Sequence, residues 1–468
     1  MPPVTLSVRL PTSRPESGDM KFLPDQGNAC AAVIGMGYVG SAVAAALAGE
    51  GVDVVGIDLD PARVAQLARR RCAFSEPGLP ELLYSGLDSG RLRVTTDYGP
   101  VSDADVVIIA VGTPVQDTRL VDHYLRAACT ELAGRLRRGQ LVILKSTVPP
   151  GVSRKIVAPL LESGGLTVGE DFGLAFCPER LSEGRALHEL RTFPIAVGGW
   201  CPDSAAAAAA FWRRTIGTEI IHCTSMESAE MVKLANNWWI DHNIAMANEL
   251  AKLCAVLDVD VLEVIAAANT IRKGTGNVNI LLPSVGVGGS CLTKDPWMVW
   301  RAARDRGLDL DTVPVARRVN DSMPGYTVDL IAEELARAGR SLGQAKIAVL
   351  GVAFKNNTGD LRATPVLPVV TGLREGGAEV AVFDPLADPA EVAKVFGVTP
   401  ARTAREALAG ADCIAVLARH DEFAEIDFVA LRESMAPSCV IVDGRAYYSR
   451  EAIDRFRRHG FGYRGIGR

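Results

Sequence analysis

Strand and helix signals alternate along two separate stretches of this chain, and this alternation constrains its fold more than any other feature. In the first stretch, short apolar runs separated by helical segments lie at residues 31–34, 52–57, 104–111, 141–145 and 173–176. In the second stretch they lie at residues 346–350, 379–383, 412–417 and 440–442. Such alternation predicts parallel strands connected by crossover helices.

The segment between these stretches has a helical pattern instead. Residues 226–257 combine helix formers and apolar spacing without Pro or Gly, which predicts one helix of roughly 45 Å. A helix of this length usually bridges domains or packs against a second subunit. The chain is therefore predicted to be an α/β protein, with two Rossmann-like open parallel-sheet domains joined by a helical central domain with a long helix.

Four parts are expected along the 468 residues, which are too many for one hydrophobic core. Residues 1–28 are rich in Pro, Ser and charge, and they lack the apolar core of a signal peptide, so we expect a disordered extension. The first α/β domain should span residues 29–212 and the helical domain residues 213–325. The second α/β domain should span residues 326–468.

The bulk properties of the chain limit its partners. Its net charge of −5 gives no basic excess for nucleic acid or an anionic membrane. No apolar run approaches the roughly 18 residues that a membrane-spanning helix needs. The ten cysteines are scattered without a CxxC pair, which predicts no metal site and a reducing, cytoplasmic location.

A glycine-rich motif follows the first predicted strand. The segment Gly35-Met36-Gly37-Tyr38-Val39-Gly40 has the G-x-G-x-x-G spacing that lets backbone and a helix N-terminus approach a pyrophosphate. Asp58 ends the next strand, where its carboxylate can accept hydrogen bonds from ribose hydroxyls and repel a 2′-phosphate. NAD is therefore favoured over NADP, although Arg63 nearby acts against this preference. The expected cofactor contacts here are Gly35, Gly37, Tyr38, Val39, Gly40, Asp58 and Arg63.

A second glycine-rich segment, residues 283–296, delivers a single cysteine. Cys291 is followed closely by Lys294 and Asp295. Glycines such as Gly288 let a substrate approach the backbone, and a neighbouring lysine favours the thiolate that attacks carbonyls. Local spacing alone leaves open whether Cys291 is a nucleophile or a buried structural cysteine.

Seven ordered motifs across residues 31–448 resemble those of the UDP-glucose/GDP-mannose dehydrogenase family, whose members oxidise nucleotide sugars to uronates. Besides the cysteine segment, the matching segments are residues 111–114, 145–151, 177–184, 233–249, 351–362 and 443–445. The resemblance implies NAD as cofactor in the first domain and a nucleotide sugar, preferably a UDP-sugar, as substrate in the last. It also implies a homodimer formed through the central helical domain.

The resemblance further implies a reaction in which Cys291 holds the intermediate aldehyde as a thiohemiacetal and then as a thioester. Lys233 and Asn237 lie four residues apart, so they share one helix face and can stabilise a developing oxyanion. Asp295 would order a water with Thr147 and act as base in the first step. Glu179 would be the base for thioester hydrolysis.

The remaining implied contacts are with cofactor and substrate. The family's cofactor contacts correspond to Thr113, Thr147 and Lys294. Its substrate-binding positions correspond to Glu183, Lys233, Asn237, Gly288, Lys355, Arg362 and Arg445.

Departures from the family pattern concern the identity of the sugar. Many relatives that act on N-acetylamino sugars carry His at the position that Ser290 occupies in this chain. Yet residues 277–280, 287–289 and 296–297 resemble the UDP-N-acetylmannosamine branch of the family. That branch tends to place an Arg at the position of Asn277, and the nearest Arg here is Arg272. Ser284 and Val285 replace the usual Gly-Pro.

Two other classes of function share parts of this pattern. A two-electron hydroxyacid-type dehydrogenase shares the Rossmann and helical plan but needs no cysteine, so the Cys291 loop argues against it. A catalytically inactive, nucleotide-sugar-binding protein would be supported by loss of Cys291, Lys233 or Asp295, and all three are present.

Overall fold

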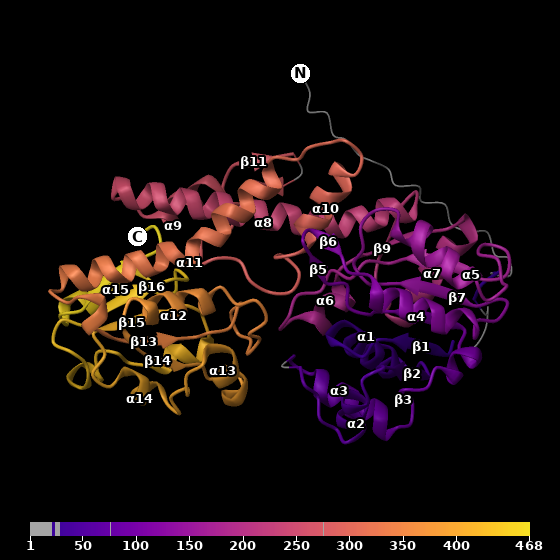
Figure 1. Cartoon of the computed structure of the whole chain (residues 1–468), viewed down its shortest axis with the longest axis horizontal. Helices are drawn as coiled ribbons and strands as arrows, with labels where there is room; N and C mark the ends of the chain where they lie inside the picture. Colours follow the sequence, from indigo (N-terminus) through magenta and orange to yellow (C-terminus); the bar gives the residue numbers. More distant parts are fainter. Residues whose placement is uncertain (1–20, 24–28, 75, 275) are drawn as a thin grey trace. The chain divides into compact units, whose positions relative to one another are not determined.

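The computed structural model describes residues 21–23, 29–74, 76–274 and 276–468. Its described residues form two compact units (Figure 1). The N-terminal unit comprises residues up to 236 together with residues 297–309, and the C-terminal unit comprises residues 237–296 and 310–468. Two helices, α8 (Met226–Leu257) and α10 (Asp295–Arg304), contribute residues to both units.

The N-terminal unit is built on an eight-stranded sheet with the order β10-β9-β8-β7-β4-β1-β2-β3. Its neighbours are parallel except for the β8–β9 pair. The strands are β1 (Ala31–Ile34), β2 (Val54–Ile57), β3 (Leu92–Thr95), β4 (Val106–Ile109), β7 (Leu141–Leu144), β8 (Gly173–Phe176), β9 (Ile195–Gly199) and β10 (Ile220–His222). A two-stranded hairpin, β5 (Val115–Gln116) with β6 (Arg119–Leu120), stands apart.

Helices cover both faces of this sheet. The helical segments of the unit are α1 (Tyr38–Gly49), α2 (Pro61–Ala68), α3 (Leu79–Asp88), η1 (Gly99–Asp103), α4 (His123–Ala133), η2 (Ser153–Val157), α5 (Ala158–Glu162), α6 (Ala186–Thr192) and α7 (Pro202–Thr215). One buried cluster joins α1, α3 and α7 to one face, and a second joins α4, α5 and the start of α8 to the other. Burial on both faces explains why these strands read as continuous apolar runs.

The C-terminal unit holds a five-stranded, fully parallel sheet with the order β14-β13-β15-β16-β17. The strands are β13 (Lys346–Leu350), β14 (Glu379–Phe383), β15 (Cys413–Val416), β16 (Val440–Asp443) and β17 (Gly462–Gly465). A short hairpin of β11 (Arg272–Lys273) and β12 (Gly276–Asn277) follows the α9 helix. The helical segments are α9 (Val261–Ala268), α11 (Thr312–Arg337), η3 (Leu342–Gln344), α12 (Val366–Glu375), α13 (Pro389–Phe396), α14 (Ala404–Leu408), η4 (Asp421–Glu425), η5 (Arg432–Ser434) and α15 (Arg450–Arg458).

The expected extension at residues 1–28 is only partly described, since residues 1–20 and 24–28 lie outside the described residues. The described segment, Lys21–Leu23, contradicts disorder there. Phe22 is fully buried in the core of the N-terminal unit, and the Lys21 ammonium donates to the Gly169 carbonyl oxygen at 2.8 Å. The ring of Phe22 fills the space that a side chain on Gly173 would need. Composition alone cannot reveal a single buried aromatic side chain of this kind.

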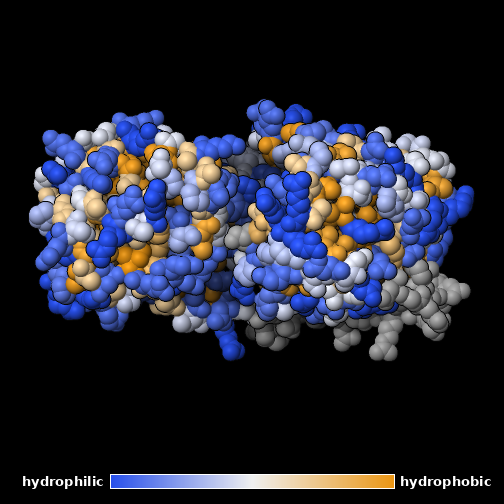
Figure 2. Space-filling view, turned by 90° about the horizontal axis from the view of Figure 1, so that it is seen from below, coloured by the Kyte–Doolittle hydropathy of each residue, from blue (hydrophilic) through white to orange (hydrophobic). Residues whose placement is uncertain are grey.

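The surface drawn in Figure 2 is mainly hydrophilic, with smaller hydrophobic areas between the polar residues. None of the helices in the described ranges combines the length and the apolar character that crossing a membrane requires. All ten cysteines are free thiols.

Candidate active site

The glycine motif after β1 is shaped for a dinucleotide. Gly35 has a φ of +94°, and a Cβ on Gly40 would collide with the Gly35 carbonyl oxygen, so neither position accepts a side chain. Space around Gly37 is open. The Asp58 carboxylate accepts the Met36 N–H at 2.8 Å and pairs with the Arg63 guanidinium at 2.9 Å. The residues present therefore fit NAD, because the start of α1 has donors suited to a pyrophosphate and the Asp58 carboxylate has acceptors suited to a ribose.

A buried carboxylate links this motif to the acidic loop at residues 177–184. Glu76 accepts the Gly184 N–H at 2.6 Å, the Ala186 N–H at 2.7 Å and the hydroxyl of Tyr38. Burial, followed by the hydrogen bond to Glu76, raises the pKa of Tyr38 well above its usual value. Glu183, expected to bind substrate, precedes the anchored Gly184 in this loop.

Glu179 and Lys233 are brought together in the N-terminal unit. The Lys233 ammonium lies 3.4 Å from the Glu179 carboxylate, and both side chains are almost completely buried. The Leu181 N–H also donates to Glu179. A buried pair of this kind is costly to break, since removing one partner strips the other of its compensating charge.

The loop that carries Thr147 is fixed from two sides. Glu230, fully buried on α8 and three residues before Lys233, accepts the N–H groups of Gly151 at 2.5 Å and Ser153 at 2.9 Å. The Ser146 hydroxyl donates to the Val111 carbonyl oxygen at 2.8 Å, which ties this loop to the segment before Thr113. Thr113 itself is buried.

Asn237, Lys294 and Asp295 meet in the C-terminal unit. The Asp295 carboxylate is fully buried, accepts the Asn237 amide at 2.6 Å and pairs with the Lys294 ammonium at 2.5 Å. Both carboxylate oxygens are thus engaged. This geometry suits a residue that orients Asn237 and Lys294 better than a freely accessible base.

Cys291 is exposed, which excludes the structural-cysteine interpretation. The loop before it packs tightly on the segment after β13. A Cβ on Gly288 would lie 2.5 Å from the Ala363 carbonyl oxygen and 2.7 Å from the Phe354 Cβ, and a Cβ on Gly289 would lie 2.6 Å from the Phe354 ring. The cysteine loop therefore needs glycine at both positions because it lies directly on Phe354 and on the backbone of Ala363.

A cavity of about 290 Å³ opens beside this loop. It is lined by Ile244, Leu282, Pro283, Ser284, Gly286, Val287, Gly288, Leu292, Phe354, Lys355, Asn356 and Arg445. Three predicted substrate-binding residues, Gly288, Lys355 and Arg445, thus share one cavity. Burial lowers the pKa of Arg445 to about 10, and its guanidinium donates to the carbonyl oxygens of Leu417 at 2.7 Å and Phe354 at 3.1 Å.

Arg362, a further predicted substrate residue, does not line that cavity. Its guanidinium pairs with Asp360, two residues earlier. The structure therefore gives Arg362 a local ion pair.

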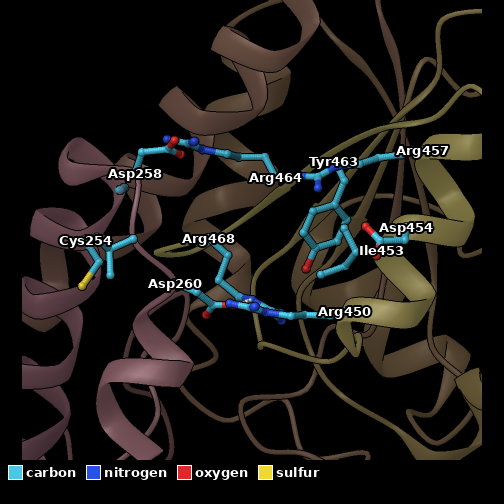
Figure 3. A pocket seen from close by; sticks show the side chains of 12 residues that line it. Cys254, Asp258, Asp260, Arg450, Ile453, Asp454, Arg457, Tyr463, Arg464 and Arg468 are labelled. Carbon is cyan, nitrogen blue, oxygen red and sulfur yellow. Dashed lines mark hydrogen bonds and ion pairs between the residues drawn. The ribbon is translucent and has the colours of Figure 1, made fainter. Parts of the chain in front are cut away.

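A second cavity, of about 350 Å³, is rich in arginine but carries matching carboxylates (Figure 3). Arg450 and Arg468 converge on Asp260, at 3.5 and 3.1 Å. The Arg464 side chain lies 4.0 Å from Glu334. These pairs join the start of α9 to α15 and to Arg468, and α11 to β17, and they indicate a structural role rather than an anion site.

Sequence reasoning missed Glu76, Glu230 and Phe354. Helix periodicity offered a signal only for Glu230, which shares a face of α8 with Lys233. Glu76 and Phe354 act through contacts with residues far away in the sequence.

A glycine-motif dinucleotide site in one unit and a cation-lined cavity beside an exposed cysteine in the other define an NAD-dependent dehydrogenase with a separate nucleotide-binding domain. Three family domains match the chain, all from the UDP-glucose/GDP-mannose dehydrogenase family. They are its NAD binding domain at residues 29–216, its central domain at 227–322 and its UDP binding domain at 348–450. The chain belongs to this family and is an NAD-dependent nucleotide-sugar dehydrogenase.

Individual relatives agree with this assignment. The UDP-N-acetyl-D-mannosamine dehydrogenase of Pyrococcus horikoshii is 35% identical over 93% of this chain and 99% of its own. A solved structure of the UDP-D-ManNAc dehydrogenase from Pyrococcus horikoshii has a TM-score of 0.84 at 34% identity, covering 94% of this chain and 99% of that chain. A UDP-glucose dehydrogenase from Pyrobaculum islandicum has a TM-score of 0.82 at 32% identity, covering 95% and 98%.

Proposed function

We propose that the enzyme oxidises the C6 hydroxymethyl group of a UDP-sugar to a carboxylate, with Cys291 holding the intermediate covalently. The observation that carries this proposal is the exposed Cys291, on a glycine-rich loop that packs against the Phe354 segment of the UDP binding domain. NAD, when bound, supplies the hydride acceptor for each oxidation. The relatives named above act on UDP-sugars, which supports UDP over GDP.

The proposed covalent sequence consists of two oxidations followed by one hydrolysis. Loss of a hydride and a proton converts the alcohol into an aldehyde, and the Cys291 sulfur adds to its carbonyl carbon to give a thiohemiacetal. Loss of a second hydride and proton gives a thioester. Water then gives a proton to Glu179 and adds to the thioester carbonyl, the carbon–sulfur bond breaks, and the acid and the Cys291 thiolate separate.

The chain's own residues have distinct proposed tasks. Lys233 and Asn237 stabilise the developing oxyanion, and Glu179 removes a proton from the hydrolytic water. Asp295 acts by holding Asn237 and Lys294. Glu183 positions the sugar. Lys355 and Arg445 bind the diphosphate part of the substrate, with Gly288 leaving room for it.

This function is tested by counting NADH formed per sugar consumed with a panel of nucleotide sugars. The panel contains UDP-linked N-acetylmannosamine, N-acetylglucosamine and glucose, and GDP-mannose as the contrasting nucleotide. We expect two NADH per sugar with a UDP-sugar, because two hydrides must leave to reach the acid. One NADH per sugar would instead indicate a two-electron alcohol dehydrogenase, and turnover of GDP-mannose alone would overturn the UDP assignment.

We also propose a homodimer that forms through the C-terminal part of α8. Large apolar side chains repeat there at seven-residue spacing and are exposed: Trp239 by 49%, Met246 by 44% and Leu253 by 54%. Two helical turns separate successive members, so the three form one stripe. Val256, exposed by 83%, continues the apolar surface near the end of the helix.

The free cysteines support the expected cytoplasmic location.

Charge in this stripe should separate the subunits. We expect Met246→Asp/Leu253→Asp to convert the dimer into a monomer, since two buried carboxylates without partners oppose association by several kcal/mol. Sedimentation measures the mass of the assembly and therefore distinguishes dimer from monomer. The matched control is Leu308→Asp, which alters an exposed leucine outside α8 and should leave the mass unchanged. A stripe variant that sediments like the parent chain contradicts this interface.

A further inference from the structure

A fully buried histidine–aspartate pair lies behind the segment that follows β13. His420 Nε2 is 3.1 Å from Asp384 Oδ2, and both side chains are 0% exposed. Asp384 follows β14 directly, and His420 comes four residues after the end of β15. Both flank β13 in the sheet, so the pair sits where the carboxyl ends of three parallel strands meet.

The pair is hydrogen-bonded to both ends of one segment, residues 352–357. Asp384 Oδ2 accepts the N–H of Val352 at 2.7 Å and, more weakly, that of Ala353 at 3.4 Å. The N–H of Asn357 is shared between His420 Nδ1, at 3.0 Å, and the Arg419 carbonyl oxygen, at 3.1 Å. Because Nδ1 is an acceptor, the proton lies on Nε2 and is donated to Asp384. The pair therefore clamps the segment at its start and at its end.

Charge on Asp384 favours this arrangement. Burial acts to raise the pKa of Asp384, but the hydrogen bond from the neutral His420 ring and the backbone donors outweigh burial, so the pKa lies below its usual value. The carboxylate therefore fixes the histidine tautomer that accepts from Asn357.

Between the two clamped ends lie residues that form the substrate cavity. Phe354, Lys355 and Asn356 line it, and the Phe354 ring fills the space beside Gly289 in the cysteine loop, while its Cβ lies against Gly288. The Phe354 carbonyl oxygen also accepts from the Arg445 guanidinium at 3.1 Å. Displacement of this segment would move Lys355 and loosen the contact with Arg445.

We infer that Asp384 and His420 are positioning residues, which preset the 352–357 segment for the nucleotide part of the substrate. Neither side chain touches the cavity itself. Their effect is to hold Lys355 and Phe354 in the conformation that binds, so that ordering this segment costs little when substrate arrives. The inference rests on the proposed function, in which this cavity takes the UDP part of the substrate.

Two substitutions at His420 separate the two halves of the clamp. His420→Asn places an acceptor near the position of Nδ1 but cannot reach Asp384. His420→Gln can donate toward Asp384 but gives up the acceptor for Asn357. Because the Asn357 bond holds the segment directly, we expect Gln to weaken UDP binding roughly three- to tenfold, the range for one hydrogen bond, and Asn to weaken it less.

The measurement is calorimetric titration of the full-length enzyme with UDP, followed by KM values for UDP-sugar and for NAD. We expect the UDP dissociation constant and the sugar-nucleotide KM to rise together, with kcat and the NAD KM changing less than about twofold. Asp384→Asn, which removes the charge that fixes the tautomer, should act in the same direction. His459→Asn, at an exposed histidine of the same unit, is the matched control and should change nothing.

Thermal unfolding of each variant distinguishes positioning from simple loss of stability. A variant that has a lower melting temperature yet binds UDP with the parental affinity overturns the inference. An equal rise in the UDP dissociation constant and in the NAD KM also overturns it. Failure of the proposed function looks different. In that case the parent enzyme itself does not bind UDP, or Lys355→Ala and Arg445→Ala leave UDP binding unchanged.

Discussion

Replacing Cys291 by alanine is expected to abolish formation of the acid and to limit the enzyme to one NADH per sugar. Without sulfur, the aldehyde cannot be captured, and the second oxidation lacks the tetrahedral carbon from which a hydride leaves. Cys291→Ser should lower kcat at least about 10³-fold, equivalent to some 4 kcal/mol, because a serine hydroxyl is a poor nucleophile without a dedicated base. NADH counting together with mass spectrometry of the product checks both results.

The matched control for this prediction is Cys72→Ser. Cys72 is also a free thiol but lies half-buried in the N-terminal unit, far along the chain from the cysteine loop. It should retain two NADH per sugar and the parental kcat. A Cys291→Ala enzyme that still yields two NADH per sugar would remove the covalent mechanism and leave an aldehyde hydrate as the species oxidised.

The sequence predicted helices and strands best where burial imposes a regular pattern of apolar residues. The long helix α8 was expected at residues 226–257, and it begins and ends at those residues. Strands β8, β13 and β14 also match their predicted ranges. Every residue of β8 and four of the five residues of β13 are buried, so hydrophobic residues are required on both faces and the apolar run reveals these strands, whereas β14 is an edge strand whose run is only partly buried.

Elements without such a pattern were missed. The edge strand β17 reads Gly-Tyr-Arg-Gly, which has no apolar run, and its pairing with β16 comes from the tertiary fold. Helix α11 begins at Thr312 and carries Pro324 inside it, although a proline ordinarily ends or kinks a helix. A proline in a helix interior removes one hydrogen bond, and here the helix continues because this stretch packs in a buried position.

The residues of the candidate site also divide into those that the sequence reveals and those that it does not. Cys291, Gly288 and Lys233 stand in motifs that can be recognised locally. The residues that hold such groups in place make contacts across long sequence separations, as Glu76 does with Gly184 and His420 does with Asn357. No spacing rule connects positions that only the folded sheet brings together, so these supporting residues emerge from the structure alone.

Glu179→Gln is expected to trap the enzyme after both oxidations. In the proposed reaction Glu179 serves only the hydrolysis of the thioester, so the oxidations should proceed while acid release slows by about 10²- to 10⁴-fold, the usual range for loss of a general base. Rapid mixing should show a burst of two NADH per active site followed by a stall. Intact mass measurement should then find the uronyl group on Cys291.

The ion pair with Lys233 provides the test that separates catalysis from disruption of the site. Glu179→Gln takes a carboxylate away from a buried ammonium 3.4 Å distant, so part of any effect could reflect a displaced Lys233 rather than a missing base. Lys233→Met breaks the same pair from the other side. Because Lys233 is proposed to stabilise the oxyanion in the oxidations, that variant should slow the burst itself and accumulate no thioester. A two-NADH burst in Glu179→Gln together with a slow, burst-free reaction in Lys233→Met would assign the two residues to different steps. Identical kinetics in both variants would instead show that the substitutions act only by breaking the ion pair.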